Sequence, residues 1–125
     1  METFKEQNQQ INRLSINLEE AIRNSFECLK ATTLCLQHCL SIGGKHGHIK
    51  HITLLKECAE ICEITASFMM ESSSFSDEVG GICARVCDFC SDSCYELDPH
   101  DQIILACMTA CKNCADSCRN MEHES

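Results

Sequence analysis

Thirteen cysteines dominate the chemistry available to this chain of 125 residues. Two segments, CARVCDFCSDSC starting at Cys83 and CMTACKNCADSC starting at Cys107, repeat a single spacing of four cysteines at steps of four, three and four. Because a helix turns by about 100° per residue, this spacing places four sulfurs within an arc of about 60°. Each segment therefore predicts a helix with one face made of sulfur.

The other cysteines follow the same frame on two earlier segments. Four helices with four positions each are filled by the thirteen cysteines together with Thr32, Thr65 and Met69. Packing alone does not explain this, because helix seams normally use Leu, Ile, Val or Ala. The candidate metal ligands are therefore Cys28, Cys35, Cys39, Cys58, Cys62, Cys83, Cys87, Cys90, Cys94, Cys107, Cys111, Cys114 and Cys118.

Breaks rich in glycine, serine or proline separate the segments that carry these stripes. They read SIGGKHGH, SSSFSD and LDPHD, and they leave four stretches of helical length at about 18–41, 49–71, 77–97 and 99–121. Short breaks between long helices favour antiparallel neighbours. The sequence predicts an all-α fold, an antiparallel up-down-up-down four-helix bundle over residues 18–125, with residues 1–17 as a short extra helix or extension.

Polar residues near the breaks predict where the helices begin. Asn17 resembles the first residue of a capping box before the first long helix. Ser76 is a candidate N-cap for the third helix, and Asp98 followed by Pro99 has the pattern of an N-cap before the fourth.

Composition narrows the classes of partner and the expected location. The formal net charge is −9 and the sequence pI is about 5.0, so the chain repels phosphate backbones and we expect no nucleic-acid partner. No apolar run is long enough to span a membrane, and the N-terminus has no apolar signal-peptide core. We therefore expect a cytoplasmic protein, whose odd number of cysteines stays reduced instead of forming a disulfide framework.

Soft thiolates select Cu(I), Zn(II) or iron–sulfur clusters. Cys87, Cys90, Cys111 and Cys114 have nearly the spacing of a zinc ribbon, but a continuous file of sulfurs exceeds what one closed tetrahedron needs. The C-x3-C-x2-C pattern is similar to the cluster motif of radical enzymes, which need a much larger barrel. Cu(I) fits best, since it accepts two or three thiolates and tolerates shared sulfurs, which allows roughly one ion per cysteine.

Two alternatives remain open at this point. One is a zinc- or iron–sulfur-binding redox or regulatory helical protein with one or two metal sites. The other is a helical interaction domain whose thiols are incidental, which predicts no tight binding of soft metals. A count of bound ions separates both alternatives from a storage protein, which catalyses no reaction.

Histidines and a methionine gather at the ends of the predicted sulfur stripes. His51 and His100 each lie seven residues before the first cysteine of a stripe, so we expect both in register with it. His46 and His48 lie in the adjoining glycine-rich loop, and all four histidines are candidates for metal uptake or auxiliary ligation. At the opposite end Met69 offers a thioether, which is also a Cu(I) ligand.

The two C-x3-C-x2-C-x3-C helices, the partial stripes CLKATTLCLQHC and CAEIC, and the proline-histidine turn before the last helix resemble the bacterial copper storage proteins of the cytosolic type. The resemblance covers residues 18–121. It implies a four-helix bundle that fills with many Cu(I) ions, a homotetramer, and a histidine-lined mouth at the end of His51 and His100. Ile104 stands where relatives can carry a second histidine, and the cysteines are fewer than many relatives have.

Overall fold

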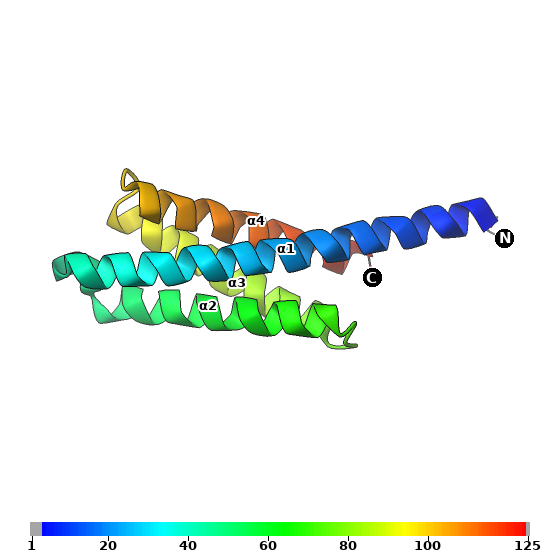
Figure 1. Cartoon of the computed structure of the whole chain (residues 1–125), viewed down its shortest axis with the longest axis horizontal. Coiled ribbons are helices and arrows are strands. Elements are labelled where there is room, and N and C mark those ends of the chain that lie inside the picture. The colour runs from blue at the N-terminus through cyan, green and yellow to red at the C-terminus, as the bar shows by residue number, and fades with distance from the viewer. Residues whose placement is uncertain (1–3, 125) are drawn as a thin grey trace.

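The computed structural model describes the backbone of residues 4–124 and the side chains of residues 16–121. Its elements are α1 (Phe4–Ile42), a short 3₁₀ turn η1 (Gly44–Gly47), α2 (Ile49–Met70), α3 (Ser76–Leu97) and α4 (Gln102–Glu124). The helices run alternately up and down, and α1 and α3 each pack against both α2 and α4 (Figure 1). The predicted all-α, antiparallel four-helix bundle is confirmed.

Helix α1 is longer than the sequence pattern indicated. It is continuous from Phe4 to Ile42, so the predicted helix start at Asn17 is wrong. No glycine or proline interrupts this stretch, and a single asparagine in a helix interior costs only a few tenths of a kcal/mol up to about 0.7 kcal/mol. The assignment of residues 1–17 as a separate part of the chain stays a prediction.

Two glycines end α1 and turn the chain toward α2. Gly43 and Gly44 have φ angles of 73° and 55°, the left-handed region that glycine enters without a Cβ penalty. The amide of Gly43 donates to the carbonyl of Cys39 at 3.0 Å, which satisfies one of the carbonyl groups left free at a helix end. The sharp turn allows α2 to pack antiparallel to α1.

Helix α4 is capped by Asp101 and not by Asp98, which corrects the prediction by about one turn. Asp101 Oδ1 accepts hydrogen bonds from the backbone amides of Ile103 at 2.9 Å and Ile104 at 3.1 Å. Its other carboxylate oxygen, Oδ2, lies 2.7 Å from His38 Nε2 on α1. The same side chain therefore starts α4 and ties it to the end of α1.

The predicted N-cap at Ser76 is also wrong. Ser76 is the first residue of α3, and its hydroxyl donates to the carbonyl of Phe68 at 3.3 Å instead of accepting from the amides of α3. Asp77 and Glu78 do lie in the first turn of α3, where carboxylates interact favourably with the positive end of the helix dipole.

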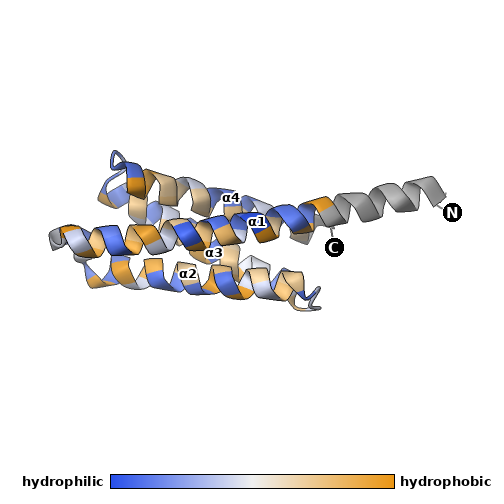
Figure 2. Cartoon of the chain, in the orientation of Figure 1, coloured by the Kyte–Doolittle hydropathy of each residue, from blue (hydrophilic) through white to orange (hydrophobic). Residues whose placement is uncertain are grey.

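The interior of the bundle is built mainly of sulfur. All thirteen cysteines have a relative exposure of 0%, and all are free thiols. None of the described aromatic side chains is buried. Hydrophobic and hydrophilic residues alternate along each helix, as amphipathic helices around a shared core require (Figure 2).

Within the described residues, no helix combines the length and apolar character needed to cross a bilayer.

Replacing Asp101 by alanine should lower the free energy of unfolding by about 1 kcal/mol or more, because α4 loses its capping acceptor. Asp101→Asn keeps an acceptor oxygen and should recover most of that loss. Urea unfolding followed by circular dichroism measures the difference. An Asp101→Ala midpoint equal to that of the unmodified chain would contradict the assignment of this cap.

The stabilisation by Asp101 should also depend on pH. Its hydrogen bond to His38, together with the two amide hydrogen bonds, lowers the pKa of the carboxyl group below its ordinary value of 3.8. A carboxyl group with a lowered pKa stabilises the folded state above its ordinary pKa, and this contribution is lost as pH falls through the lowered pKa. The stability gap between the chain and Asp101→Ala should therefore shrink below about pH 4.

Candidate metal centre

The four sulfur stripes meet on the bundle axis. At mid-height each helix contributes one thiol, namely Cys28 from α1, Cys58 from α2, Cys87 from α3 and Cys111 from α4, and their ligand atoms all lie within 4.8 Å of one another. Sulfur–sulfur distances are 3.7 Å for Cys28–Cys111, 3.8 Å for Cys58–Cys87 and 3.9 Å for Cys28–Cys58. The stripes therefore face each other, as their spacing predicts.

This central layer has the dimensions of a thiolate metal site. A tetrahedron with edges of about 3.8 Å has its centre about 2.3 Å from each corner, which equals the zinc–thiolate bond length. A soft ion therefore fits among these four sulfurs with little movement of the helices. One layer by itself does not choose between zinc and copper.

The way in which neighbouring layers share sulfurs does favour copper. Cys28 and Cys87 of the central layer also belong to a second group of four with Cys62 and Cys114, and Cys114 belongs in turn to a group with Cys83 and Cys118. Cu(I) tolerates such bridging thiolates, whereas structural zinc prefers closed tetrahedra of its own. Sulfurs already in van der Waals contact also leave little volume for the inorganic sulfide of an iron–sulfur cluster.

Before metal binds, burial favours the neutral thiol form of the sulfur stripes. None of the lysines and arginines whose side chains are described is buried, so no cation stands beside the sulfurs to stabilise a thiolate. Burial raises the pKa of the Cys39 thiol, because desolvation disfavours its charged form. A neutral thiol packs as a small apolar group, which lets the bundle fold without metal. Metal binding must then release protons, because the thiolate is the ligand.

One histidine completes a sulfur group at the end of the bundle where α1 ends. His51 is 6% exposed, and its Nε2 lies 3.6 Å from Cys39 Sγ, so that Cys35, Cys39 and His51 form a group of three possible ligands. Its Nδ1 lies 2.8 Å from Ser93 Oγ. If Nδ1–H donates to Ser93, the lone pair of Nε2 faces the sulfurs, which is the orientation that a metal requires.

His51 is also kept neutral. Burial, and to a lesser extent the nearby His46, lowers the pKa of His51 below its usual value. A neutral imidazole can bind a metal ion near neutral pH without first losing a proton. His51 lies beside the thiols, as its predicted register with the sulfur stripe requires.

The other predicted histidines lie outside the core. His100 is exposed, because α4 begins at Gln102 and His100 lies in the turn before it, so the predicted register with the stripe is wrong. His46 Nε2 lies 3.3 Å from Asp98 Oδ2, and His48 accepts a hydrogen bond from the Lys50 amide at the start of α2. Their roles in uptake or ligation stay predictions.

An apolar collar separates the His51 end from the central thiols. Leu55 lies between His51 and Cys58 on α2, and Ile104 lies one turn before Cys107 on α4, and both are completely buried. Sequence analysis did not single out Leu55, although its position three residues before Cys58 continues the stripe. Beside these two side chains, Cys35 on α1 belongs to a group of three possible ligands with Cys94 and Cys107.

The opposite end of the stripes is closed by small residues and Met69. Met69 is completely buried and lies beside Gly80. A Cβ added to Gly80 would lie 3.2 Å from Met69 Cε and 3.9 Å from Cys118 Sγ. Ser25 is another group that sequence analysis missed, and its Oγ lies 3.7 Å from Cys114 Sγ. The available signal was its position three residues before the first cysteine of α1. Ligation by Met69 stays a prediction.

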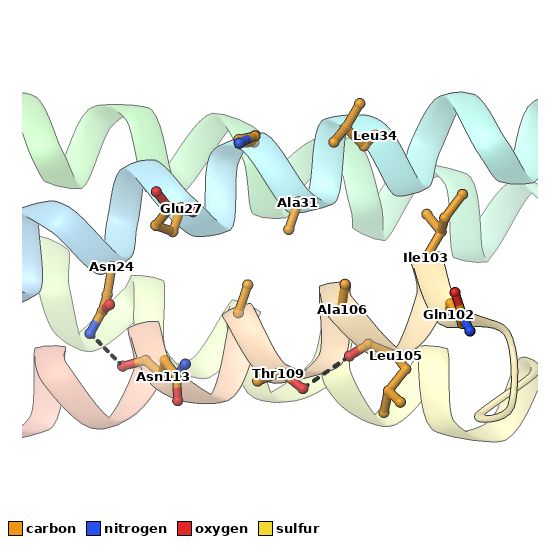
Figure 3. A pocket seen from close by; sticks show the side chains of 12 residues that line it. Asn24, Glu27, Ala31, Leu34, Gln102, Ile103, Leu105, Ala106, Thr109 and Asn113 are labelled. Atoms are coloured by element: carbon orange, nitrogen blue, oxygen red, sulfur yellow. Dashed lines mark hydrogen bonds between the residues drawn. The ribbon is translucent and has the colours of Figure 1, made fainter.

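A groove on the outside of the bundle is distinct from this centre. It has a volume of about 790 Å³ and lies between α1 and α4, with Ala31, Ala106 and Ala110 among its lining residues. Figure 3 shows Leu34 and Ile103 on the two helices that form it. No cysteine or histidine is among the residues that line this groove.

Similarity to known proteins agrees with the chemistry of the core. The family described as "Csp: Copper storage protein" matches residues 15–123. The cysteine-rich protein YhjQ of Bacillus subtilis, itself uncharacterized, is 36% identical over 83 residues, which cover 66% of this chain and 76% of YhjQ.

Two solved structures have the same fold. The Nmul_A1745 protein of Nitrosospira multiformis is 37% identical with a TM-score of 0.82, and the match covers 89% of this chain and 99% of that one. The Cu(I)-bound copper storage protein BsCsp3 is 34% identical with a TM-score of 0.77, and the match covers 84% of this chain and 97% of that one.

Proposed function

This chain belongs to the copper storage protein family, and we propose that it stores Cu(I) in the cytoplasm by enclosing many ions among the thiolates of its bundle core. The observation that carries this function is the set of overlapping sulfur groups to which all four helices contribute. Overlap provides bridging ligands along the axis, which a protein with one or two isolated metal sites does not need.

Each Cu(I) ion is bound by cysteine sulfurs that lose their protons when the ion binds. A thiol loses its proton to water as its sulfur binds Cu(I), and no electron is transferred. If each ion takes two thiolates and each thiolate bridges two ions, the thirteen cysteines hold roughly one ion per sulfur. We propose all thirteen as ligands, and we expect no catalytic turnover, because the chemistry ends with binding.

An anaerobic titration of the reduced protein with Cu(I) against a coloured Cu(I) chelator tests storage directly. We expect uptake to continue to about ten or more ions per chain, because shared thiolates raise capacity toward one ion per cysteine. Proton release, followed in weak buffer, should rise in parallel.

Zn(II) is the matched comparison in that titration. Zinc should saturate at only a few ions per chain, because each needs about four thiolates to itself. A Cu(I) plateau below about four ions would contradict storage and favour the alternative of one or two isolated sites.

We further propose that Cu(I) enters the bundle at His51. The imidazole lies at the outer end of the sulfur file, and its Nε2 faces Cys39. In stopped-flow uptake, His51→Gln should slow binding several-fold while lowering the final capacity by one ion at most. His100→Gln is the comparison and should slow uptake less than His51→Gln, since His100 is exposed in the turn before α4. Equal rates for both variants and the unmodified chain would contradict a port at His51.

We also infer that the protein is a homo-oligomer. The family resemblance implies a tetramer. The groove between α1 and α4 supports a contact between copies, because Leu34 and Leu105 at its edges are 56% and 47% exposed. Apolar side chains concentrated around one groove are typical of an interaction surface. A mass of one chain in light scattering would contradict this inference.

A further inference from the structure

Two threonines occupy positions within the sulfur stripes, and they use their hydroxyl groups differently. Thr32 on α1 donates to the carbonyl of Cys28, four residues earlier, at 2.7 Å. This is the ordinary arrangement of a threonine in a helix. Thr65 on α2 is equally buried, but its Oγ1 has no hydrogen-bond partner among the described residues. Within residues 16–121 it is the one buried side-chain nitrogen or oxygen in that situation.

A buried hydroxyl without a partner destabilises a folded protein, so the feature needs an explanation. The usual remedy was available, because a threonine in a helix can reach the carbonyl three or four residues earlier, as Thr32 does. Valine has nearly the same shape and would avoid the unpaired group altogether. The hydroxyl of Thr65 therefore costs stability in the empty protein without any visible compensation there.

Helix register places Thr65 at the closed end of the stripe, at the level of the last sulfur ligands. Cys62, one turn earlier on α2, lies 3.9 Å from Cys83 on α3. Because α2 and α3 are antiparallel, Thr65 reaches the level of Gly80, three residues before Cys83. A Cβ on Gly80 would lie 3.9 Å from Cys118 Sγ, so Thr65 and Cys118 share this level of the bundle. Cys118 belongs to the group with Cys83 and Cys114.

Metal binding changes the charge of the sulfurs at this level of the bundle and their strength as hydrogen-bond acceptors. A neutral thiol is a weak hydrogen-bond acceptor, whereas a thiolate is negatively charged and accepts strongly. Two thiolates on one unshared Cu(I) leave a net negative charge, which falls as the sulfurs bridge further ions, and none of the described lysines or arginines is buried to balance it. Ser25, whose Oγ lies 3.7 Å from Cys114 Sγ, shows that a hydroxyl can contact a ligand sulfur at this end.

We propose that Thr65 donates its hydroxyl hydrogen to a thiolate of the Cu(I)-loaded closed end, and so stabilises the loaded state over the empty one. This inference rests on the proposed storage function. Each thiol there gives its proton to water when its sulfur binds Cu(I), and the threonine keeps its own proton and shares it with the new thiolate. Thr65 is thus a positioning residue that acts on the ligands and does not itself bind the metal.

Thr65→Val tests the proposal, because it removes the hydroxyl and keeps the shape. The empty variant should unfold at the same temperature as the unmodified chain or higher, since an unpaired polar group is lost. The Cu(I)-loaded variant should release part of its copper at about tenfold lower concentrations of a competing Cu(I) chelator, because a hydrogen bond to a charged group has been removed. Opposite effects on the two states are not expected of a residue that only packs.

Thr32→Val is the matched control on α1. It removes a hydroxyl that already bonds to its own helix, so it should leave the chelator concentration for release within about twofold of that of the unmodified chain, well short of the tenfold change expected for Thr65→Val. Thr65→Ser restores a donor at the same position and should restore copper retention. If Thr65→Val retains copper as the unmodified chain does, or if Thr65→Ser fails to rescue retention, the proposal is overturned. Failure of the unmodified chain to bind many Cu(I) ions would instead overturn the storage function itself.

Discussion

Contact between sulfur atoms from all four helices is the constraint on which the rest of this structure depends. A thiol is small, so four stripes can meet on one axis with sulfur–sulfur distances of 3.7–3.9 Å between helices. None of the described Phe and Tyr side chains is buried among them. The same atoms serve two states. Neutral thiols act as a weakly polar core that folds without metal, and thiolates act as ligands once protons have been exchanged for Cu(I).

The two ends of the sulfur file differ in chemistry. Where α1 ends, His51 contacts Cys39 and hydrogen-bonds to Ser93, and Leu55 and Ile104 are completely buried. The closed end instead presents Met69 and two hydroxyl-bearing residues at the level of the last sulfurs. This difference between the ends is the basis of the two proposals, uptake at His51 and stabilisation of bound ligands by Thr65.

Much of this organisation could be predicted from spacing alone. The steps of four, three and four place the cysteines on one face of each helix. Four such faces are most stable when they pack against one another, away from charged residues. The family follows from the same pattern, whereas helix number and antiparallel order follow from the short breaks between the stripes. The residues of the closed end were harder to find, because Ser25 and Gly80 continue the stripe without being cysteine.

The parts that sequence analysis missed depend on local competition between hydrogen-bond acceptors. Asp98 before Pro99 has the pattern of a cap, yet Asp101 reaches two free amides of α4, and this moves the helix start past His100 and places that histidine in the turn. Asn17 does not break α1, because no neighbouring glycine or proline assists it. The unpaired hydroxyl of Thr65 depends on a rotamer, which no sequence pattern reveals.

Anomalous X-ray diffraction at the copper absorption edge, from crystals of the fully loaded protein, tests the central claim most directly. The sulfur-lined axis predicts a file of copper peaks running along the inside of the bundle, each within bonding distance of at least two cysteine sulfurs. Copper held only by surface groups, with the axial thiols left unbound, would contradict the account.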